Sequence, residues 1–260
     1  VYKPKKRTIS VGKESELVLQ FHPFELQFSN RFGQTVLILN QRHLMNWEFF
    51  RTRPAELTND LDGEWSENFQ SHEDRKPRGP TAVGMDVSFV GVNHVFGIPS
   101  HATNFSLPST RGTVKRYDDP YRLYNLDVFE YEIDNPMALY CHVPVMVGHS
   151  KSHTAGFFWM NAAETWIDVD KSSLPGSVAT HWISESGIID AFLLPGPTPH
   201  DVLHQYGLLT GRVQLPPRFA IGYHQCKWNY KSEQEVSELD ANFDLHRIPY
   251  DVVWLDIEHT

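Results

Sequence analysis

The strongest constraint on the fold lies near the end of the chain, where an apolar strand, a helix and a second apolar strand follow one another. Residues 219–224 read Phe-Ala-Ile-Gly-Tyr-His, and residues 252–255 read Val-Val-Trp-Leu. A polar loop and a predicted helix separate the two runs. Strand, helix and strand over about forty residues form one βαβ unit. This unit is typical of parallel α/β barrels.

The helix between these strands has a clear beginning and end. Ser232 and Glu235 form an S-x-x-E capping box, in which we expect the serine oxygen to accept a backbone N–H and the glutamate to reach back to the N–H of Ser232. Pro249 closes the helical segment, because a proline pushes the residue before it out of helical conformation. The second strand should then begin at Tyr250. One face of the helix is apolar, with Val236, Leu239 and Phe243 at three- and four-residue spacing.

The second strand turns acidic where it ends, at Asp256 and Glu258. In parallel barrels the chemistry takes place at the carboxyl ends of the strands, so this placement predicts a functional site. One interpretation is a metal-dependent barrel hydrolase with Asp256, Glu258 and His259 as ligands. An H-x-H spacing would then be expected on the first strand, where only His224 occurs. The metal site is therefore kept as an alternative.

The earlier part of the chain follows a different pattern. Several short runs are rich in β-branched or aromatic residues and are bounded by Pro, Gly or Asn, which predicts strands. Some of them alternate with period two, as half-buried strands do. Together they predict an antiparallel β-sandwich rather than a barrel. The predicted strands are residues 16–21, 24–28, 35–39, 138–143, 153–159 and 188–194.

A second predicted helix and a stiff connector separate the two patterns. Thr198 is the expected N-cap, Pro199 occupies the first helical position, and Asp201 lies near the positive end of the helix dipole. Gly211 is expected to end this helix.

The connector that follows, residues 214–217, reads Gln-Leu-Pro-Pro. We therefore place the domain boundary near Leu215. Residues 1–214 are predicted to form the N-terminal β-sandwich domain, and residues 215–260 the start of an incomplete (β/α)8 TIM barrel.

Charge and cysteine content narrow the function classes. A net charge of -9 and a pI near 5.8 argue against nucleic-acid binding, which needs a basic face. No apolar stretch approaches the ~18 residues of a membrane span. Cys141 and Cys226 have no C-x-x-C spacing and lie in apolar runs, so we expect buried free thiols.

Longer strings give the chain a specific resemblance. Residues 215–230 and 249–259 resemble the barrel entry of the family 31 glycoside hydrolases, with Gly-Tyr-His-Gln in the first string and Trp-Leu-Asp-Ile-Glu-His in the second. The resemblance covers roughly residues 15–260 and implies a galactose-mutarotase-like sandwich followed by a (β/α)8 barrel. Further strings that carry it are residues 79–86, 94–101, 120–129 and 135–139.

The resemblance implies a retaining α-glucosidase, in which one aspartate attacks the anomeric carbon and another acts first as acid and then as base. The family needs no metal or cofactor. Its two catalytic aspartates lie on later barrel strands, and its nucleophile motif, Trp-x-Asp-Met-Asn-Glu, does not occur in these 260 residues. We therefore expect no catalytic residue in this chain and activity only with the remaining C-terminal polypeptide of the same enzyme. A non-catalytic carbohydrate-binding sandwich is a further alternative.

The resemblance also implies substrate-binding residues. Asp256 matches the family aspartate that ends the second barrel strand and hydrogen-bonds glucose hydroxyls. Asp127 matches a second sugar-contacting aspartate, which a loop of the sandwich carries. Ile257 falls where the family has an apolar pocket contact, and Trp228 follows the first strand, where an indole can stack on a sugar. Packing would explain Trp228 and Ile257 equally well.

Within the family, the strings are closest to the members that trim glucose from N-linked glycans. Those members imply a location in the endoplasmic-reticulum lumen, α-1,3-linked glucose on high-mannose glycans as the substrate, and a non-catalytic β subunit as a partner. The sequon Asn104-Phe-Ser permits N-glycosylation, which fits a protein of the secretory pathway.

Overall fold

The computed structural model describes residues 5–12, 15–52, 66–76 and 78–259. The chain divides into two compact units, Val1–Thr210 and Gly211–Thr260. The predicted boundary near Leu215 lies in the segment between helix α1 (Pro199–Thr210) and the short 3-10 helix η1 (Arg218–Ile221). In the described part of the chain, no helix has the length and apolarity needed to cross a membrane.

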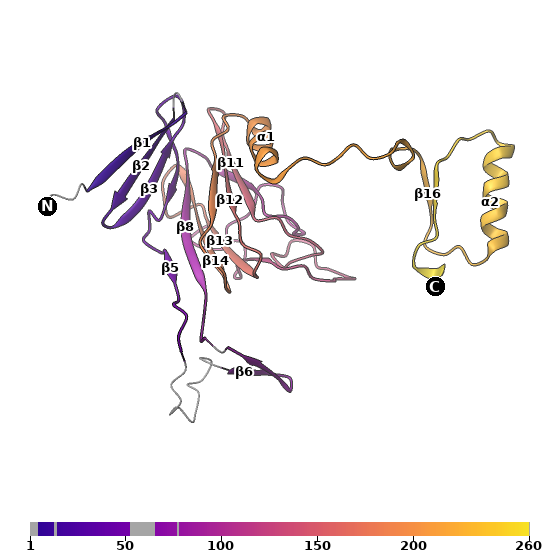
Figure 1. The fold of residues 1–260 in the computed structure, drawn as a ribbon, viewed down its shortest axis with the longest axis horizontal. Coiled ribbons are helices and arrows are strands. Elements are labelled where there is room, and N and C mark those ends of the chain that lie inside the picture. The colour runs from indigo at the N-terminus through magenta and orange to yellow at the C-terminus, as the bar shows by residue number, and fades with distance from the viewer. Residues whose placement is uncertain (1–4, 13–14, 53–65, 77, 260) are drawn as a thin grey trace. The chain divides into compact units, whose positions relative to one another are not determined.

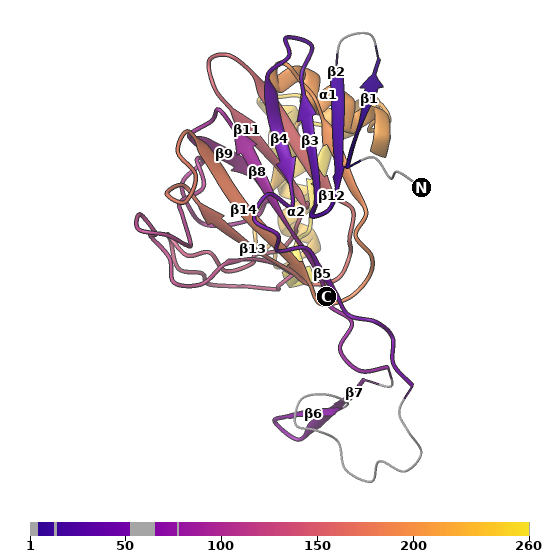
Figure 2. The same ribbon diagram turned by 90° about the vertical axis from the view of Figure 1, so that its left-hand side faces the viewer.

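The first unit is a sandwich of two antiparallel sheets, as Figures 1 and 2 show. The larger sheet has the strand order β1-β2-β3-β4-β8-β14-β13-β10, with β5 paired to β8, and the smaller sheet has the order β15-β12-β11-β9. Strands β6 and β7 form a separate two-stranded sheet. The predicted mainly-β, antiparallel sandwich is confirmed. The strands are β1 (Lys6–Val11), β2 (Ser15–Phe21), β3 (Phe24–Ser29), β4 (Thr35–Leu39), β5 (Asn46–Trp47), β6 (Ser66–Phe69), β7 (His72–Arg75), β8 (Val83–Val90), β9 (His94–Gly97), β10 (Tyr121–Leu123), β11 (Val145–His149), β12 (Thr154–Trp159), β13 (Thr165–Asp170), β14 (Ser177–Ser184) and β15 (Ala191–Leu194).

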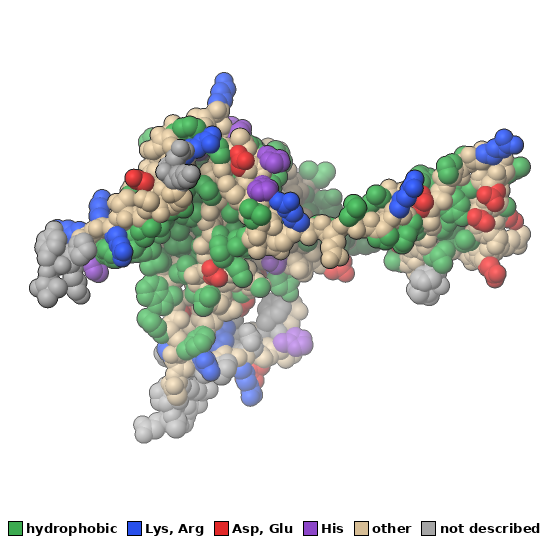
Figure 3. Space-filling view, turned by 45° about the horizontal axis from the view of Figure 1, so that its top comes forward, with side chains coloured by type: hydrophobic (Ala, Val, Ile, Leu, Met, Phe, Trp, Pro, Cys, Tyr) green, Lys and Arg blue, Asp and Glu red, His purple; other side chains and the backbone are tan. Residues whose placement is uncertain are grey.

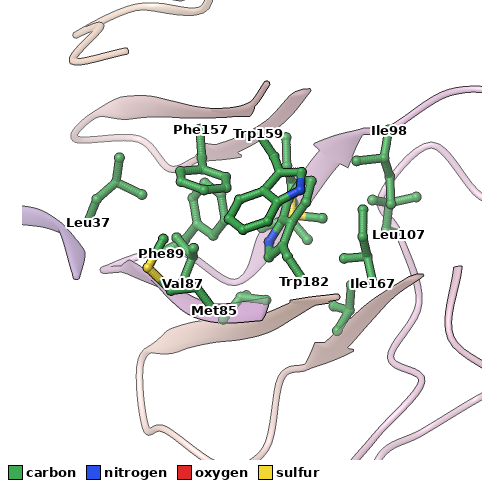
Figure 4. Close-up of a cluster of buried hydrophobic side chains, with 14 of the residues drawn as sticks. Leu37, Met85, Val87, Phe89, Ile98, Leu107, Phe157, Trp159, Ile167 and Trp182 are labelled. Atoms are coloured by element: carbon green, nitrogen blue, oxygen red, sulfur yellow. The ribbon is translucent and has the colours of Figure 1, made fainter. Parts of the chain in front are cut away.

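Aromatic side chains from both sheets fill the space between them (Figure 4). Phe157 and Trp159 of β12 meet Trp182 of β14, and the rings of Phe157 and Trp182 pack edge to face with centroids 5.1 Å apart. All three are fully buried. Each indole N–H has an acceptor, Ser184 Oγ at 2.8 Å for Trp159 and Thr180 Oγ1 at 2.9 Å for Trp182. Burial of these large rings without an unsatisfied N–H makes this the rigid centre of the unit.

The sequence patterns do not predict three central strands of the larger sheet, namely β8, β13 and β14. Almost all of β8 is buried, so it lacks the alternation that marks a half-exposed strand. It also contains the fully buried Asp86, whose carboxylate accepts the backbone N–H groups of Arg42 at 2.8 Å and Leu44 at 2.9 Å. These two hydrogen bonds satisfy the carboxylate of Asp86, so a residue of this type is tolerated at a buried strand position.

The predicted strand at residues 138–143 is wrong, because this segment is irregular. Its carbonyls accept hydrogen bonds from two different loops, Leu139 O from the N–H of Leu126 and Cys141 O from the N–H of Ser100, both at 2.8 Å. No regular ladder forms. The predicted burial of both thiols is also wrong, since Cys141 and Cys226 are exposed.

The second unit is one parallel strand-helix-strand motif, as predicted. Strands β16 (His224–Cys226) and β17 (Val252–Trp254) pair in parallel, and helix α2 (Glu233–Leu245) connects them (Figure 1). The first strand begins later than predicted, because residues 218–221 form η1, in which the N–H of Ala220 bonds to Pro217 O at 3.0 Å. Proline at 216 and 217 has no N–H for a sheet ladder, which favours this turn.

Both helices begin at the predicted caps. In α1, Thr198 Oγ1 accepts the N–H of Asp201 at 3.1 Å, and the carboxylate of Asp201 accepts the N–H of Thr198 at 3.1 Å. In α2, Ser232 Oγ accepts the N–H of Glu235 at 3.1 Å, but Glu235 bonds the N–H of Lys231 at 2.8 Å instead of that of Ser232. The predicted reciprocal box is therefore wrong in its second half, because the ion pair of Glu235 with Lys227 draws the carboxylate toward the preceding loop.

Candidate functional site

Asp256 lies in the turn that follows β17. Its φ of 34° is in the left-handed region, which Asp tolerates better than most residues, and its Oδ1 accepts the N–H of Ile257 at 2.9 Å. The chain then enters the short 3-10 helix η2 (Ile257–His259). This turn leaves the Asp256 side chain exposed at the carboxyl end of β17.

The structure brings Trp228 to the same turn. Because Cys226 pairs with Trp254 in the parallel register, the carboxyl ends of β16 and β17 lie at one edge. Trp228, two residues beyond β16, donates its indole N–H to Glu258 Oε1 at 2.9 Å. Glu258 is thus the partner of the predicted sugar-stacking indole. Trp228 is 53% exposed, so part of its ring stays open to a ligand.

A capped loop holds Trp228 in place. Lys227 pairs with Glu235 at the start of α2 and lies over the ring of Tyr230, 4.8 Å from its centroid. The hydrogen bonds from Lys227 and from the N–H of Lys231 hold the pKa of Glu235 below its usual value. Tyr230 is buried, and its hydroxyl accepts from Gln225 Nε2 at 3.3 Å. The loop between β16 and α2 is thus fixed on both sides of the indole.

His224 uses both ring nitrogens within the second unit. Its Nδ1 accepts the indole N–H of Trp254 at 2.7 Å, so the ring carries its proton on Nε2, which bonds Ala220 O at 3.1 Å. Neither nitrogen is then available to a metal ion in this arrangement. No cluster of three or more metal-ligating side chains occurs among the residues that the structure describes.

Asp127 lies in the first unit, on the irregular segment that follows β10. The side chain is exposed, and the preceding N–H, that of Leu126, bonds Leu139 O at 2.8 Å. Leu126 and Val128, on either side of Asp127, line a pocket of about 300 Å³. Asp127 therefore lies beside this pocket, in a loop whose two ends are joined by a backbone hydrogen bond.

Hydrogen bonds to Asp134 hold the later part of this loop in place. Its carboxylate accepts hydrogen bonds from the Tyr117 hydroxyl and the Arg116 guanidinium, which lower the pKa of Asp134. Burial, together with the bond to Asp134, raises the pKa of Tyr117. The hydroxyl groups of Thr103 and Tyr117 also bond each other. Sequence reasoning missed this cluster because its members come from three separate segments.

Asn104 lies in an irregular, exposed segment. The next residue, Phe105, is 85% exposed, and its ring packs 4.9 Å from that of Phe96. The sequon hydroxyl, Ser106 Oγ, bonds His94 Nδ1 at 2.8 Å. The asparagine is thus accessible, and its glycosylation stays a prediction.

Comparison with known proteins identifies the family. The profile of the glycosyl hydrolase 31 N-terminal galactose mutarotase-like domain matches residues 1–168, and that of the glycosyl hydrolases family 31 TIM-barrel domain matches residues 213–260. The chain belongs to glycosyl hydrolase family 31. The fold inferred from the resemblance, a mutarotase-like sandwich followed by the beginning of a TIM barrel, is confirmed.

Relatives and solved structures point to one branch of this family. Neutral alpha-glucosidase AB of Dictyostelium discoideum is 59% identical over 201 residues, which are 76% of this chain and 21% of that protein. Glucosidase 2 subunit alpha of Schizosaccharomyces pombe is 46% identical over 97% of this chain and 28% of its own length. A crystal structure of the heterodimeric ER glucosidase II complex, with the catalytic subunit and the binding domain of the regulatory subunit, aligns with a TM-score of 0.87 and 45% identity over 99% of this chain and 29% of that chain. This family 31 chain therefore spans less than a third of these relatives.

Proposed function

We propose that this chain forms the N-terminal part of a retaining α-glucosidase that removes α-1,3-linked glucose from N-linked high-mannose glycans. The observation that carries the proposal is the exposed carboxylate of Asp256 at the carboxyl end of β17, in a family 31 chain. A relative from Arabidopsis thaliana, 46% identical over 97% of this chain and named a probable glucan 1,3-alpha-glucosidase, supports the linkage.

In this proposal the chain binds the sugar and other residues cleave it. The carboxylate of Asp256 and that of Asp127 each accept hydrogen bonds from sugar hydroxyls. Such bonds orient a sugar ring and can strengthen as it distorts toward the transition state. Trp228 and Ile257, 53% and 64% exposed, supply apolar contacts to the sugar. The nucleophile and the acid/base are two aspartates on the remaining C-terminal polypeptide. This two-carboxylate mechanism uses no metal or cofactor.

The proposal extends to the partner and the compartment. The solved ER glucosidase II complex contains a catalytic subunit with the binding domain of a regulatory subunit, which supports a non-catalytic β subunit as the partner here. We place the assembled enzyme in the endoplasmic-reticulum lumen. The exposed Asn104 in its sequon is the proposed glycosylation site that fits this compartment.

The test is Asp256→Ala in the full-length enzyme, assayed with an α-1,3-linked glucose disaccharide. Loss of two charge-assisted hydrogen bonds, each worth roughly 1.5–3 kcal/mol, should lower kcat/KM on the order of 10²- to 10⁴-fold. Asp244→Ala is the matched control, because Asp244 is an exposed carboxylate of the same unit on α2. Unchanged kcat and KM in Asp256→Ala would refute the subsite.

Two further measurements address the alternatives. Residues 1–260 without the remaining polypeptide should show no turnover, so measurable hydrolysis would contradict the proposed division of labour. Activity of the full-length enzyme should survive exhaustive chelation, whereas its loss, with recovery on adding metal, would favour a metal-dependent hydrolase. Sugar binding by a full-length protein that does not hydrolyse would favour a carbohydrate-binding sandwich.

A further inference from the structure

The loop that carries Asp127 has two arms. The outgoing arm, residues 122–126, leaves the larger sheet, and the second arm, residues 134–141, runs beside it in the same direction. Two backbone bonds join the arms, from the N–H of Leu126 to Leu139 O at 2.8 Å and from the N–H of Arg122 to Pro136 O at 3.4 Å. Asp127 is the first residue beyond the outgoing arm, so the direction of that arm sets the position of its carboxylate.

The second arm is hydrogen-bonded to the segment at residues 100–102. The N–H of Asn135 bonds Ala102 O at 3.2 Å, His101 Nδ1 bonds Met137 O at 2.9 Å, and the N–H of Ser100 bonds Cys141 O at 2.8 Å. These bonds hold the second arm along its length, and they reach the outgoing arm only through the backbone bonds of Arg122 and Leu126. The direct link between the outgoing arm and β13 has a separate cause.

Arg122 supplies that cause. It lies on β10, which pairs with β13 over three residues only at the end of the larger sheet. Its Nε donates to Glu164 Oε1 at 2.6 Å, and its guanidinium lies 4.6 Å from the ring centroid of Tyr124 and 5.4 Å from that of Trp166. One side chain thus joins β13 to Tyr124, three residues before Asp127.

The environment makes this pair stronger than an ordinary surface ion pair. The side chains of Arg122 and Glu164 are 23% and 20% exposed, so water screens them little. By contrast, Arg111, which pairs at 2.9 Å with Asp168 on β13, is 63% exposed. A planar guanidinium that is both paired and stacked resists rotation more than an ammonium group would.

We propose that Arg122 is a positioning residue for Asp127, which it aims by holding the outgoing arm through Glu164 and Tyr124. The inference rests on the proposed function, because it gives Asp127 a sugar to contact. A purely structural role for Arg122 would stabilise the edge of the sheet and leave sugar binding to Asp127 unaltered.

The test uses the full-length enzyme with Arg122→Lys, which keeps the charge but loses the planar stacking. Misplacement of Asp127 should raise KM and the inhibition constant of glucose and lower kcat/KM on the order of ten- to a hundredfold. Arg111→Lys, the matched control whose partner Asp168 lies on β13, should change neither constant. Glu164→Gln removes the partner's charge with little change in size, so it tests the same arm if Arg122→Lys does not fold.

A double-mutant cycle with Asp127→Asn separates positioning from general damage. In the Asp127→Asn background, Arg122→Lys should cost less than about twofold in kcat/KM, because the group that it positions is already lost. Equal losses in both backgrounds, or an equal loss in Arg111→Lys, would overturn the inference. Wild-type kinetics in Asp127→Asn would also overturn it, while a loss of activity in Asp256→Ala would leave the proposed function standing.

Discussion

The two units of the chain differ most in what their hydrophobic residues contact. The sandwich encloses Phe157, Trp159 and Trp182 between two sheets, with no exposure of these side chains. In the second unit, Tyr230 is the single buried hydrophobic residue among those described, and α2 buries none. Figure 3 shows hydrophobic side chains at the surface of both units. In the second unit they include Ile221, Trp254 and Ile257, all more than half exposed.

The difference follows from the architecture of each unit. An antiparallel sandwich covers the inner face of each sheet with the other sheet and needs nothing more for a core. A parallel strand pair belongs to a sheet that is buried on both faces, and one helix can cover only one of them. We therefore expect the sandwich to carry almost all of the stability of residues 1–260, and the second unit to depend on further barrel elements.

The largest difference in stability between the units should appear when one tryptophan is replaced in each. Trp182→Ala removes a fully buried ring and should lower the free energy of unfolding of the sandwich by about 3–5 kcal/mol, which corresponds to roughly 10 °C in Tm. Trp254→Ala removes a 53% exposed ring and its bond to His224, and should leave the sandwich transition unchanged. Differential scanning calorimetry of the 260-residue chain measures both. Equal shifts would show that the units unfold together.

The helix caps give a smaller and more closely matched comparison. Thr198→Ala and Ser232→Ala each remove an oxygen that accepts the N–H of the third helical residue at 3.1 Å, typically worth ~1 kcal/mol. Because the buried Val202 packs α1 against the smaller sheet, the first change should lower the urea midpoint of the sandwich. The second should increase only local amide exchange in α2. A change in the global midpoint with Ser232→Ala would contradict the independence of the units.

The smallest effect concerns acid stability of the sandwich. Burial lowers the pKa of His101 and of His181 below 6.5, so the folded state binds fewer protons than the unfolded state. Stability from these two residues is complete above pH 6.5 and decreases as the pH falls from there through their folded pKa values. Urea unfolding between pH 5 and 7.5 should show this slope, and His101→Gln with His181→Gln should flatten it. A slope that persists in the double variant would assign it to other groups.

Local signals in the sequence predicted the helices well and the strands unevenly. Both helix starts follow from caps, whose hydrogen bonds span only three residues. Strands β2 and β3 have period-two patterns, and β2, β3 and β4 were predicted nearly to their ends. Strands β8, β13 and β14 were missed. Almost all of β8 is buried, so it shows no alternation, and its Asp86 has partners more than forty residues away.

The features of the candidate site likewise divide into those that local sequence patterns predict and those that they do not. The position of Asp256 at a strand end could be predicted, since an apolar run that turns acidic is a local pattern. The bond of Trp228 to Glu258 could not, because it depends on the register of β16 with β17. Likewise, nothing near Arg122 in the sequence indicates Glu164, which lies 42 residues away.

By itself, the sequence determined the family and the order of a β-sandwich before a parallel strand-helix-strand motif, and it predicted Asp256 and Asp127 as sugar-binding residues. Only the tertiary structure decided which strands form the centre of the sandwich, how Trp228 is held and how the loop of Asp127 is anchored. The physical reason is the distance along the chain over which each interaction acts. Caps, turns and amphipathic periods arise from neighbours in the chain, whereas burial, strand register and ion pairs depend on segments that meet only after the chain has folded.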